Sequence, residues 1–241
     1  MHVSHAADVY SNLKELMFFS SAGYSSPTLK QLSDEGILDT ESKQSWFGSI
    51  VTIGAIVGGP VAGFLVEKLG RKTTILSCCV PYSVGWLLLV IGGYFTNAYQ
   101  VLYLARFICG LGTGMTSLCV PLYIGEIATK EVRGMLGAGF QLSVTVGVLS
   151  AYSFGLFLPW RWLAIVGSAF SAALVIAMLF MPETPHWQVG QKNKNEAMAS
   201  LRWLRGPNAN IDAEYDEITR NLDAQEGTFQ FRELLTKGKC H

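Results

Sequence analysis

Charge is scarce in this 241-residue sequence, and it is almost missing from five long stretches. Asp, Glu, Lys and Arg make up 15% of the residues, whereas an ordinary soluble domain carries about 25%. Four of the stretches contain no charged residue, and the other contains only Arg106. A helix of this length at a water-exposed surface needs a polar face. The sequence therefore excludes an ordinary soluble domain.

Several kinds of chemistry also lack the residues that they need. No histidine lies in the five stretches, and the chain has no Cys–His set with metal-ligand spacing and no Gly-x-Ser-x-Gly elbow. The formal net charge is zero, with no basic arm or stripe, so nucleic-acid binding has no electrostatic support. The five cysteines do not form a secreted disulfide framework, and packing in a core is the simpler interpretation. We expect neither an enzyme nor a metal or other cofactor.

What replaces charge is hydrophobicity at membrane-spanning length. A helix needs about 20 mainly apolar residues to cross the hydrocarbon core of a bilayer. The five stretches that reach this length are residues 46–66, 73–95, 101–124, 135–159 and 162–181. A sixth candidate, residues 16–29, is too short, and charged residues precede it. The sequence predicts an all-α membrane region over residues 1–181 with five spans and a truncated first span.

Small residues recur at helical spacing inside two of the predicted spans. Gly54, Gly58 and Ala62 lie four residues apart, and so do Gly59 and Gly63, and Gly110 and Gly114. Small residues at this spacing allow membrane helices to approach closely. We interpret them as packing residues.

The positions of Lys and Arg predict which side faces the cytosol. Basic residues fall in alternate breaks between spans, at Lys68, Arg71, Lys72, Lys130 and Arg133, and again in the tail. The breaks on the other side contain only Arg161. Because short cytosolic loops are rich in Lys and Arg, we expect the basic breaks and the tail on the cytosolic side.

The tail, residues 182–241, is amphipathic. Residues 195–204 and 212–222 repeat apolar side chains at helical spacing, which predicts two cytosolic helices. Residues 229–235 look like the lead-in to a seventh span.

Ordered motifs identify a family. Residues 63–72, GFLVEKLGRK, resemble the loop signature G-x-x-x-[DE]-x-x-G-R-[RK] of the major facilitator superfamily. Residues 106–114, RFICGLGTG, and 121–128, PLYIGEIA, are similar to the fourth span of the sugar porter family within it. The resemblance continues in PETPHW at 182–187 and LRWLRG at 201–206, although the family's usual arginine is His186 here.

The resemblance implies the N-terminal six-helix half of a major facilitator fold. It also implies facilitated transport of a sugar, trehalose or a hexose, by alternating access without a cofactor. The expected partners are the sugar, the lipid bilayer of the plasma membrane, and a C-terminal half or a full-length homologue. Two alternatives stay open: a non-transporting sugar sensor or regulatory fragment, and a proton-coupled symporter. Such symporters usually carry an acidic residue in the first span, which residues 17–29 do not offer.

The resemblance also implies a cytosolic gate made of ion pairs. Its expected members are Glu67, Arg71, Glu126, Arg133 and Glu183. Glu126 and Arg133 lie seven residues apart, which places them on one helical face if the helix continues that far. Such a network would close the cytosolic side and break when that side opens.

Three residues inside the predicted spans are candidates for other roles. The resemblance places a sugar-contacting glutamine at Gln141, although an interhelical hydrogen bond would also suit this amide. Thr145 lies one turn further on the same face. Arg106 is either a functional charge within the membrane or a side chain that snorkels to the outer interface. Tyr24 and Thr52 are weaker candidates to line a cavity.

Overall fold

The computed structural model of the chain describes residues 22–92, 94, 98–129, 132–206 and 209–237, and the regular elements in these ranges are all helices. The helices are α2 (Ala22–Asp34), α3 (Glu41–Leu69), α4 (Arg71–Gly92), α5 (Ala98–Ile127), α6 (Arg133–Phe157), α7 (Trp160–Leu179), α8 (Pro185–Gly190), α9 (Lys194–Arg205) and α10 (Ile211–Lys237). Five of them, α3 to α7, are long and apolar enough to cross a membrane. The predicted all-α architecture with five spans is confirmed.

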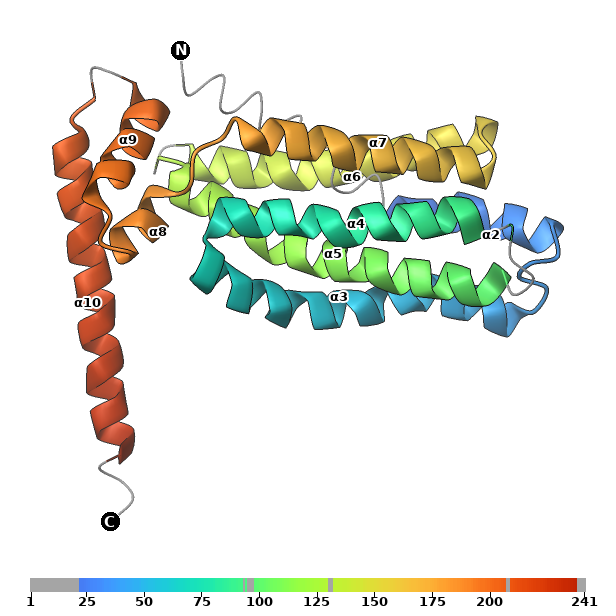
Figure 1. Cartoon of the computed structure of the whole chain (residues 1–241), viewed down its shortest axis with the longest axis horizontal. Coiled ribbons are helices and arrows are strands. Elements are labelled where there is room, and N and C mark those ends of the chain that lie inside the picture. Colours follow the sequence, from blue (N-terminus) through green and yellow to red (C-terminus); the bar gives the residue numbers. More distant parts are fainter. Residues whose placement is uncertain (1–21, 93, 95–97, 130–131, 207–208, 238–241) are drawn as a thin grey trace.

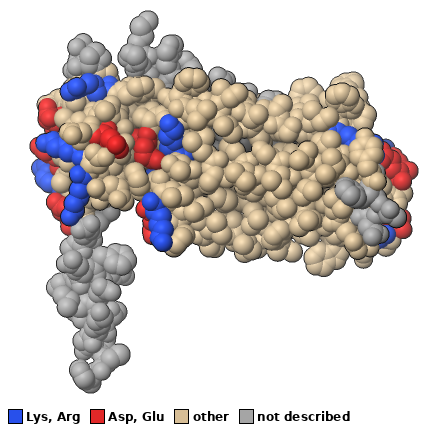
Figure 2. All heavy atoms as spheres, viewed as in Figure 1, with Lys and Arg blue, Asp and Glu red and all other residues tan. Residues whose placement is uncertain are grey.

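The spanning helices form a bundle, and the last three helices lie at one of its ends. Helices α3 to α7 run side by side along the long axis of the molecule, and α10 lies across that axis (Figure 1). Figure 2 shows Lys, Arg, Asp and Glu gathered toward the two ends, with a broad band of other residues between them. Large apolar side chains such as Ile56, Leu87 and Ile176 are exposed on the bundle. This distribution fits a protein that is surrounded by lipid around its middle.

The helices extend beyond the apolar stretches that predicted them. The first full span is helical from Glu41 to Leu69, although its apolar stretch covers only residues 46–66. The apolar stretch marks the part that lipid selects, and the backbone hydrogen bonding continues into the polar layers on both sides.

Helix α2 does not stop where the apolar stretch 16–29 ends. It begins at Ala22 and continues to Asp34, while residues 16–21 lie outside the described ranges. The polar end of α2 is anchored by Gln31, whose side-chain oxygen accepts from the backbone N–H of Trp160 at 2.6 Å. The Gln31 amide also donates to the carbonyl oxygens of Gly155 and Leu158 at 3.3 and 3.2 Å. This contact between α2 and the turn from α6 to α7 explains the added length.

The glycines of α3 and α5 allow the closest helix contact in this part of the bundle. A Cβ atom added at Gly54 would meet the carbonyl oxygen of Phe107, and one at Gly58 would meet that of Leu111. On α5, a Cβ added at Gly110 would meet the carbonyl oxygen of Val51. The interpretation as packing residues is confirmed for Gly54, Gly58, Gly110 and Gly114. It is wrong for Gly59 and Gly63, where an added Cβ would meet no atom of the described residues within 4 Å.

Two apolar clusters fill the bundle. The cluster nearer the α8–α10 end is built around residues such as Ile75, Cys119 and Tyr123, and the other around Phe47, Trp86 and Trp160. Cys78, Cys79, Cys109 and Cys119 are buried as free thiols. Core packing of these four cysteines is therefore confirmed.

Candidate functional site

An ion pair joins the start of α4 to the end of α5. The Arg71 Nη2 atom lies 2.6 Å from the Glu126 Oε1 atom, and Arg71 Nε donates to the same oxygen at 2.9 Å. The side chains are 18% and 12% exposed, so water screens the pair only in part. Charge-assisted bonds of this kind are stronger than neutral ones. The pair links α4 to α5 at the α8–α10 end of the bundle through a charge-assisted hydrogen bond.

Glu183 holds the first turn of α4 through the backbone. Its Oε1 atom accepts from the backbone N–H groups of Arg71 at 2.9 Å and Lys72 at 3.0 Å. The first N–H groups of a helix have no partner within the helix, and a negative charge is favourable at that end. Glu183 therefore fixes the helix start from which the Arg71 side chain extends.

Gly70 is required by this arrangement for two reasons. Its φ of +89° lies in the left-handed region that favours glycine. A Cβ atom at this position would also lie 2.5 Å from the Glu183 Oε2 atom. The glycine before Arg71 thus makes the turn and leaves room for the capping carboxylate.

Arg133 and Glu67 lie at the same end of the bundle but outside this ion pair. Helix α5 ends at Ile127 and α6 begins at Arg133, so the seven-residue spacing does not place Glu126 and Arg133 on one continuous helix. Among the ion pairs between described residues, none includes Arg133 or Glu67. The Glu67 side chain is exposed, and its backbone carbonyl accepts from Trp187 Nε1 at 3.3 Å.

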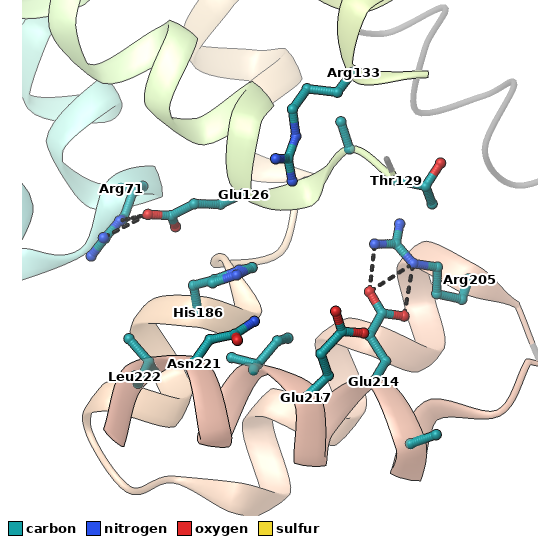
Figure 3. Close-up of a pocket in the computed structure, with 13 residues that line it drawn as sticks. Arg71, Glu126, Thr129, Arg133, His186, Arg205, Glu214, Glu217, Asn221 and Leu222 are labelled. Atoms are coloured by element: carbon teal, nitrogen blue, oxygen red, sulfur yellow. Dashed lines mark hydrogen bonds and ion pairs between the residues drawn. The ribbon is translucent and has the colours of Figure 1, made fainter. Parts of the chain in front are cut away.

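Arg71, Glu126 and Arg133 line a polar cavity of about 960 Å³ between the bundle and α8 to α10. Figure 3 shows Arg133 pointing into this cavity and Arg71 paired with Glu126 at its edge. The basic and acidic residues that line it are Arg71, Arg133, Arg205, Glu126, Glu214 and Glu217. The three arginines and three glutamates have opposite charges that balance, so the cavity does not favour an ion of either sign.

His186 lines the cavity next to the ion pair. Its Nδ1 atom and the Glu126 Oε2 atom are buried and have no hydrogen-bond partner among the described residues. Burial lowers the pKa of the His186 imidazole from its ordinary value of 6.5. The negative charge of Glu126 raises this pKa, and the positive charge of Arg71 lowers it further. His186 is therefore neutral at pH 7 in this arrangement.

Arg205 makes contacts with Glu214 and Ile127 that the sequence motifs did not reveal. Its Nη2 atom lies 2.6 Å from the Glu214 Oε1 atom, and Nη1 donates to the Ile127 carbonyl oxygen at 2.9 Å. The motif LRWLRG supported the family resemblance, but no spacing in the sequence relates residue 205 to residue 127. The residue belongs to the same polar end as Glu126.

Gln141 and Thr145 lie on an exposed face of α6, away from this polar end. Both residues are exposed, and the Thr145 hydroxyl donates to the Gln141 backbone carbonyl at 3.2 Å. Within the described ranges, the Gln141 side chain forms no interhelical hydrogen bond. Tyr152 follows Gln141 by eleven positions, which is about 20° away around a helix, and is 44% exposed. An amide on a lipid-facing surface is costly, so this face suits a polar cavity or a protein partner.

Arg106 is buried inside the bundle. Its side chain is fully buried, donates to the Ser25 hydroxyl, and lies over the rings of Tyr24 and Phe47 at 5.4 and 5.1 Å from their centroids. The side chain therefore joins α2, α3 and α5 and does not extend to the bundle surface. Tyr24 is also buried and donates to the Trp160 carbonyl, whereas Thr52 is exposed.

Comparison with known proteins gives a consistent family assignment. The family described as "Sugar (and other) transporter" matches residues 5–239. Facilitated glucose transporter member 6 of solute carrier family 2 from Homo sapiens is 36% identical over 214 residues, which are 89% of this chain and 41% of that protein. The facilitated trehalose transporter Tret1 of Bombyx mori is 39% identical over 222 residues, 90% of this chain and 42% of that protein. The chain thus spans less than half the length of these relatives.

Solved structures show the same fold. The xylose transporter XylE from E. coli, in a partially occluded inward open conformation, superposes with a TM-score of 0.83 at 20% identity. The match covers 96% of this chain and 62% of XylE. A second structure is XylE bound to 6-bromo-6-deoxy-D-glucose, described as a proton:xylose symporter of the major facilitator superfamily. It also superposes with a TM-score of 0.83, and the match covers 56% of that chain. The predicted fold, half of a major facilitator bundle, is confirmed.

Proposed function

The chain belongs to the sugar transporter family of the major facilitator superfamily, and from this premise we propose that it forms the N-terminal half of a facilitative sugar transporter. The proposed substrate is trehalose or a hexose, in line with relatives named as facilitated trehalose and glucose transporters. The proposed process is alternating access, in which two six-helix halves rock around a midplane site.

The exposed face of α6 is the observation that carries this proposal. A sugar needs hydrogen-bond donors and acceptors for its hydroxyl groups and a flat side chain against its ring. Gln141 offers both a donor and an acceptor, and Tyr152 offers an aromatic ring with a hydroxyl group. We assign Gln141, with Thr145 and Tyr152 along the same face, to the half of the sugar cavity that this chain supplies.

Alternating access also requires that the cytosolic side can close, and the Arg71–Glu126 pair is suited to hold it closed. The pair is only partly screened by water, and Glu183 fixes the helix turn on which Arg71 sits. Arg133 points into the same cavity and is available when the helix ends move. We assign this polar end to the cytosolic gate, whose pairs form in one state and break in the other.

Sugar uptake tests the proposal. The chain is joined to the C-terminal half of the Bombyx mori trehalose transporter and expressed in yeast that lacks its own sugar transporters. Uptake of labelled trehalose and glucose is compared with that of the Bombyx mori transporter cut and rejoined at the same junction. We expect saturable uptake of at least one sugar. Correct surface expression with no uptake, while the rejoined control transports, would contradict the proposal.

A further inference from the structure

Arg205 connects three helices at the proposed cytosolic end. It is the last residue of α9, and its side chain is 13% exposed. The Nε and Nη2 atoms bond the Glu214 carboxylate on α10 at distances of 2.6 to 3.1 Å. The Nη1 atom donates to the carbonyl oxygen of Ile127 at 2.9 Å. One guanidinium thus ties two cytosolic helices to a spanning helix.

The point at which Arg205 meets α5 is next to the gate. Ile127 is the last residue of α5 and directly follows Glu126. The last carbonyl groups of a helix have no partner within the helix, and a cation is favourable at that end. Arg205 therefore stabilises the final turn of α5, and the orientation of that turn decides where the Glu126 carboxylate points.

The chain around Arg205 suits this contact. Gly206 follows it with a φ of +87°, and the Gly206 N–H bonds the Arg202 carbonyl at 3.0 Å. The glycine ends α9 in the left-handed region and turns the chain away. The Arg205 side chain is thereby free to extend toward α5 while the backbone continues to α10.

The packing of the cytosolic helices on one another has a separate basis. Val189, Ala197, Leu201, Ile211 and Ile218 from α8, α9 and α10 form an apolar cluster of their own. Because Arg205 is not a member of this cluster, we expect the cluster to remain when the Arg205 charge is lost. The effect of Arg205 on α5 can therefore be separated from the folding of the cytosolic helices.

We propose that Arg205 is a positioning residue for the cytosolic gate. By holding the Ile127 carbonyl, it keeps the last turn of α5 in the orientation in which Glu126 meets Arg71. The cytosolic helices then act on the gate through this contact, which lies beside two others: Leu204 of α9 packs in the apolar cluster of the bundle, and Trp187 of α8 bonds the Glu67 carbonyl. The inference rests on the proposed function, because it concerns the same gate.

Hydrogen exchange followed by mass spectrometry tests the local part of the proposal on the full chain in lipid nanodiscs. The variant is Arg205→Gln, and the matched control is Arg202→Gln, an exposed arginine one turn earlier on α9. We expect exchange in the last turn of α5, including the Ala128 N–H that bonds the Ile124 carbonyl, to rise about tenfold in Arg205→Gln only. Arg205→Lys should restore part of the protection.

Two results would overturn this part. One is unchanged exchange at the end of α5. The other is a rise throughout α8, α9 and α10, which would show that Arg205 only maintains the fold of the cytosolic helices.

A double-mutant cycle tests the link to the gate without any transport measurement. Melting temperatures of the parent, Glu126→Gln, Arg205→Gln and the double variant are compared. If Arg205 acts by positioning Glu126, the loss of the Glu126 charge should lower the melting temperature less once Arg205 is gone. Additive shifts would show that the two residues act independently, and the inference would fail. Because neither measurement depends on sugar, failure of the proposed function is detected separately by the uptake assay.

Discussion

Glu126 and Glu183 both bond Arg71, but they bond different parts of it. Glu126 forms an ion pair with the guanidinium, and Glu183 accepts a hydrogen bond from the backbone N–H at the helix start. The first contact joins two side chains on different helices, whereas the second joins the α4 start to a carboxylate from the segment between α7 and α8. At the scale of single residues, the proposed gate is one ion pair whose arginine sits on a helix start capped by Glu183.

Glu126→Gln tests the ion pair. The substitution keeps the shape of the side chain but removes the charge that Arg71 requires, so the cytosolic side should open more often. The expected change is on the order of 1–3 kcal/mol, as for other charge-assisted bonds. In the chimeric transporter, a cysteine at Gly137 should react faster with a cytosolic maleimide, and uptake should fall. Glu41→Gln, an exposed carboxylate at the other end of α3, is the control. Equal reaction rates in both variants would leave Arg71 and Glu126 as topological anchors only.

The burial of His186 predicts a pH dependence of the proposed gate with a definite sign. Burial lowers the pKa of His186 below 6.5 in this structure, which the proposed gate equates with the closed arrangement, and exposure to water on opening would return the pKa toward that value. The open arrangement therefore binds the proton more readily, so its share rises as the cytosolic pH falls below about 6.5. The neighbouring charges are Arg71, Arg133, Arg205, Glu126, Glu214 and Glu217.

The Gly137 cysteine should thus react faster with the cytosolic maleimide at pH 6.0 than at pH 7.5. His186→Asn, which cannot titrate in this range, should remove the difference. The same difference in His186→Asn would show that another group is responsible.

At the scale of helices, hydrophobicity predicted most of the fold because lipid selects long apolar stretches. The positions of α3 to α7 follow from this selection, and so does the contact through Gly54, Gly58 and Gly110. The helix ends are less predictable because polar contacts decide them, as Gln31 does for α2. The site residues follow the same division, since the family motifs placed Arg71, Glu126 and Arg133 in one expected network but could not show that Arg133 lies outside the Arg71–Glu126 pair.

Other site contacts could not be predicted because they depend on three-dimensional geometry. The Glu183 cap requires a left-handed turn at Gly70 and a loop that returns more than 100 residues later. Arg205 meets a backbone carbonyl, and a backbone contact leaves no pattern in side chains. The apolar pattern predicted a break between residues 124 and 135, but it did not show that α5 ends at Ile127 and leaves Glu126 and Arg133 on different helices.

The glycine contacts allow a matched comparison on one helix. Gly58→Ala should force α3 away from the Leu111 carbonyl and lower the free energy of unfolding by about 1–3 kcal/mol, as overpacking does. Gly59→Ala meets open space, so it should be neutral or slightly stabilising through helix propensity. Thermal unfolding in detergent measures both. Equal effects of the two substitutions would contradict the close contact between α3 and α5.

At the scale of the whole molecule, charged residues gather toward the two ends of the bundle, and a band of other residues separates the ends. Helices α3 to α7 bring Lys68, Arg71 and Arg133 to the end where α8 to α10 lie. Positive charge is retained on the cytosolic side of membrane proteins. We therefore propose that this end faces the cytosol and that the Trp160 end faces the outside.

Labelling from outside intact cells tests this orientation. A single cysteine at the exposed Lys192, between α8 and α9, should react with an impermeant maleimide only after permeabilisation. A single cysteine at the exposed Gln100, in the first turn of α5, should react without it. The reverse pattern would overturn the assignment of both ends.

The half-saturation concentration for sugar tests the central claim most directly. The claim is that the polar face of α6 is this chain's share of a sugar cavity, completed by a second six-helix half. In the chimeric transporter, Gln141→Ala should raise the half-saturation concentration by about tenfold, as expected when a buried hydrogen bond worth about 1.4 kcal/mol is lost. Leu142→Ala, an exposed apolar neighbour off the polar face, should leave it unchanged. Gln141→Ala with normal surface expression and the half-saturation concentration of the parent would contradict the claim.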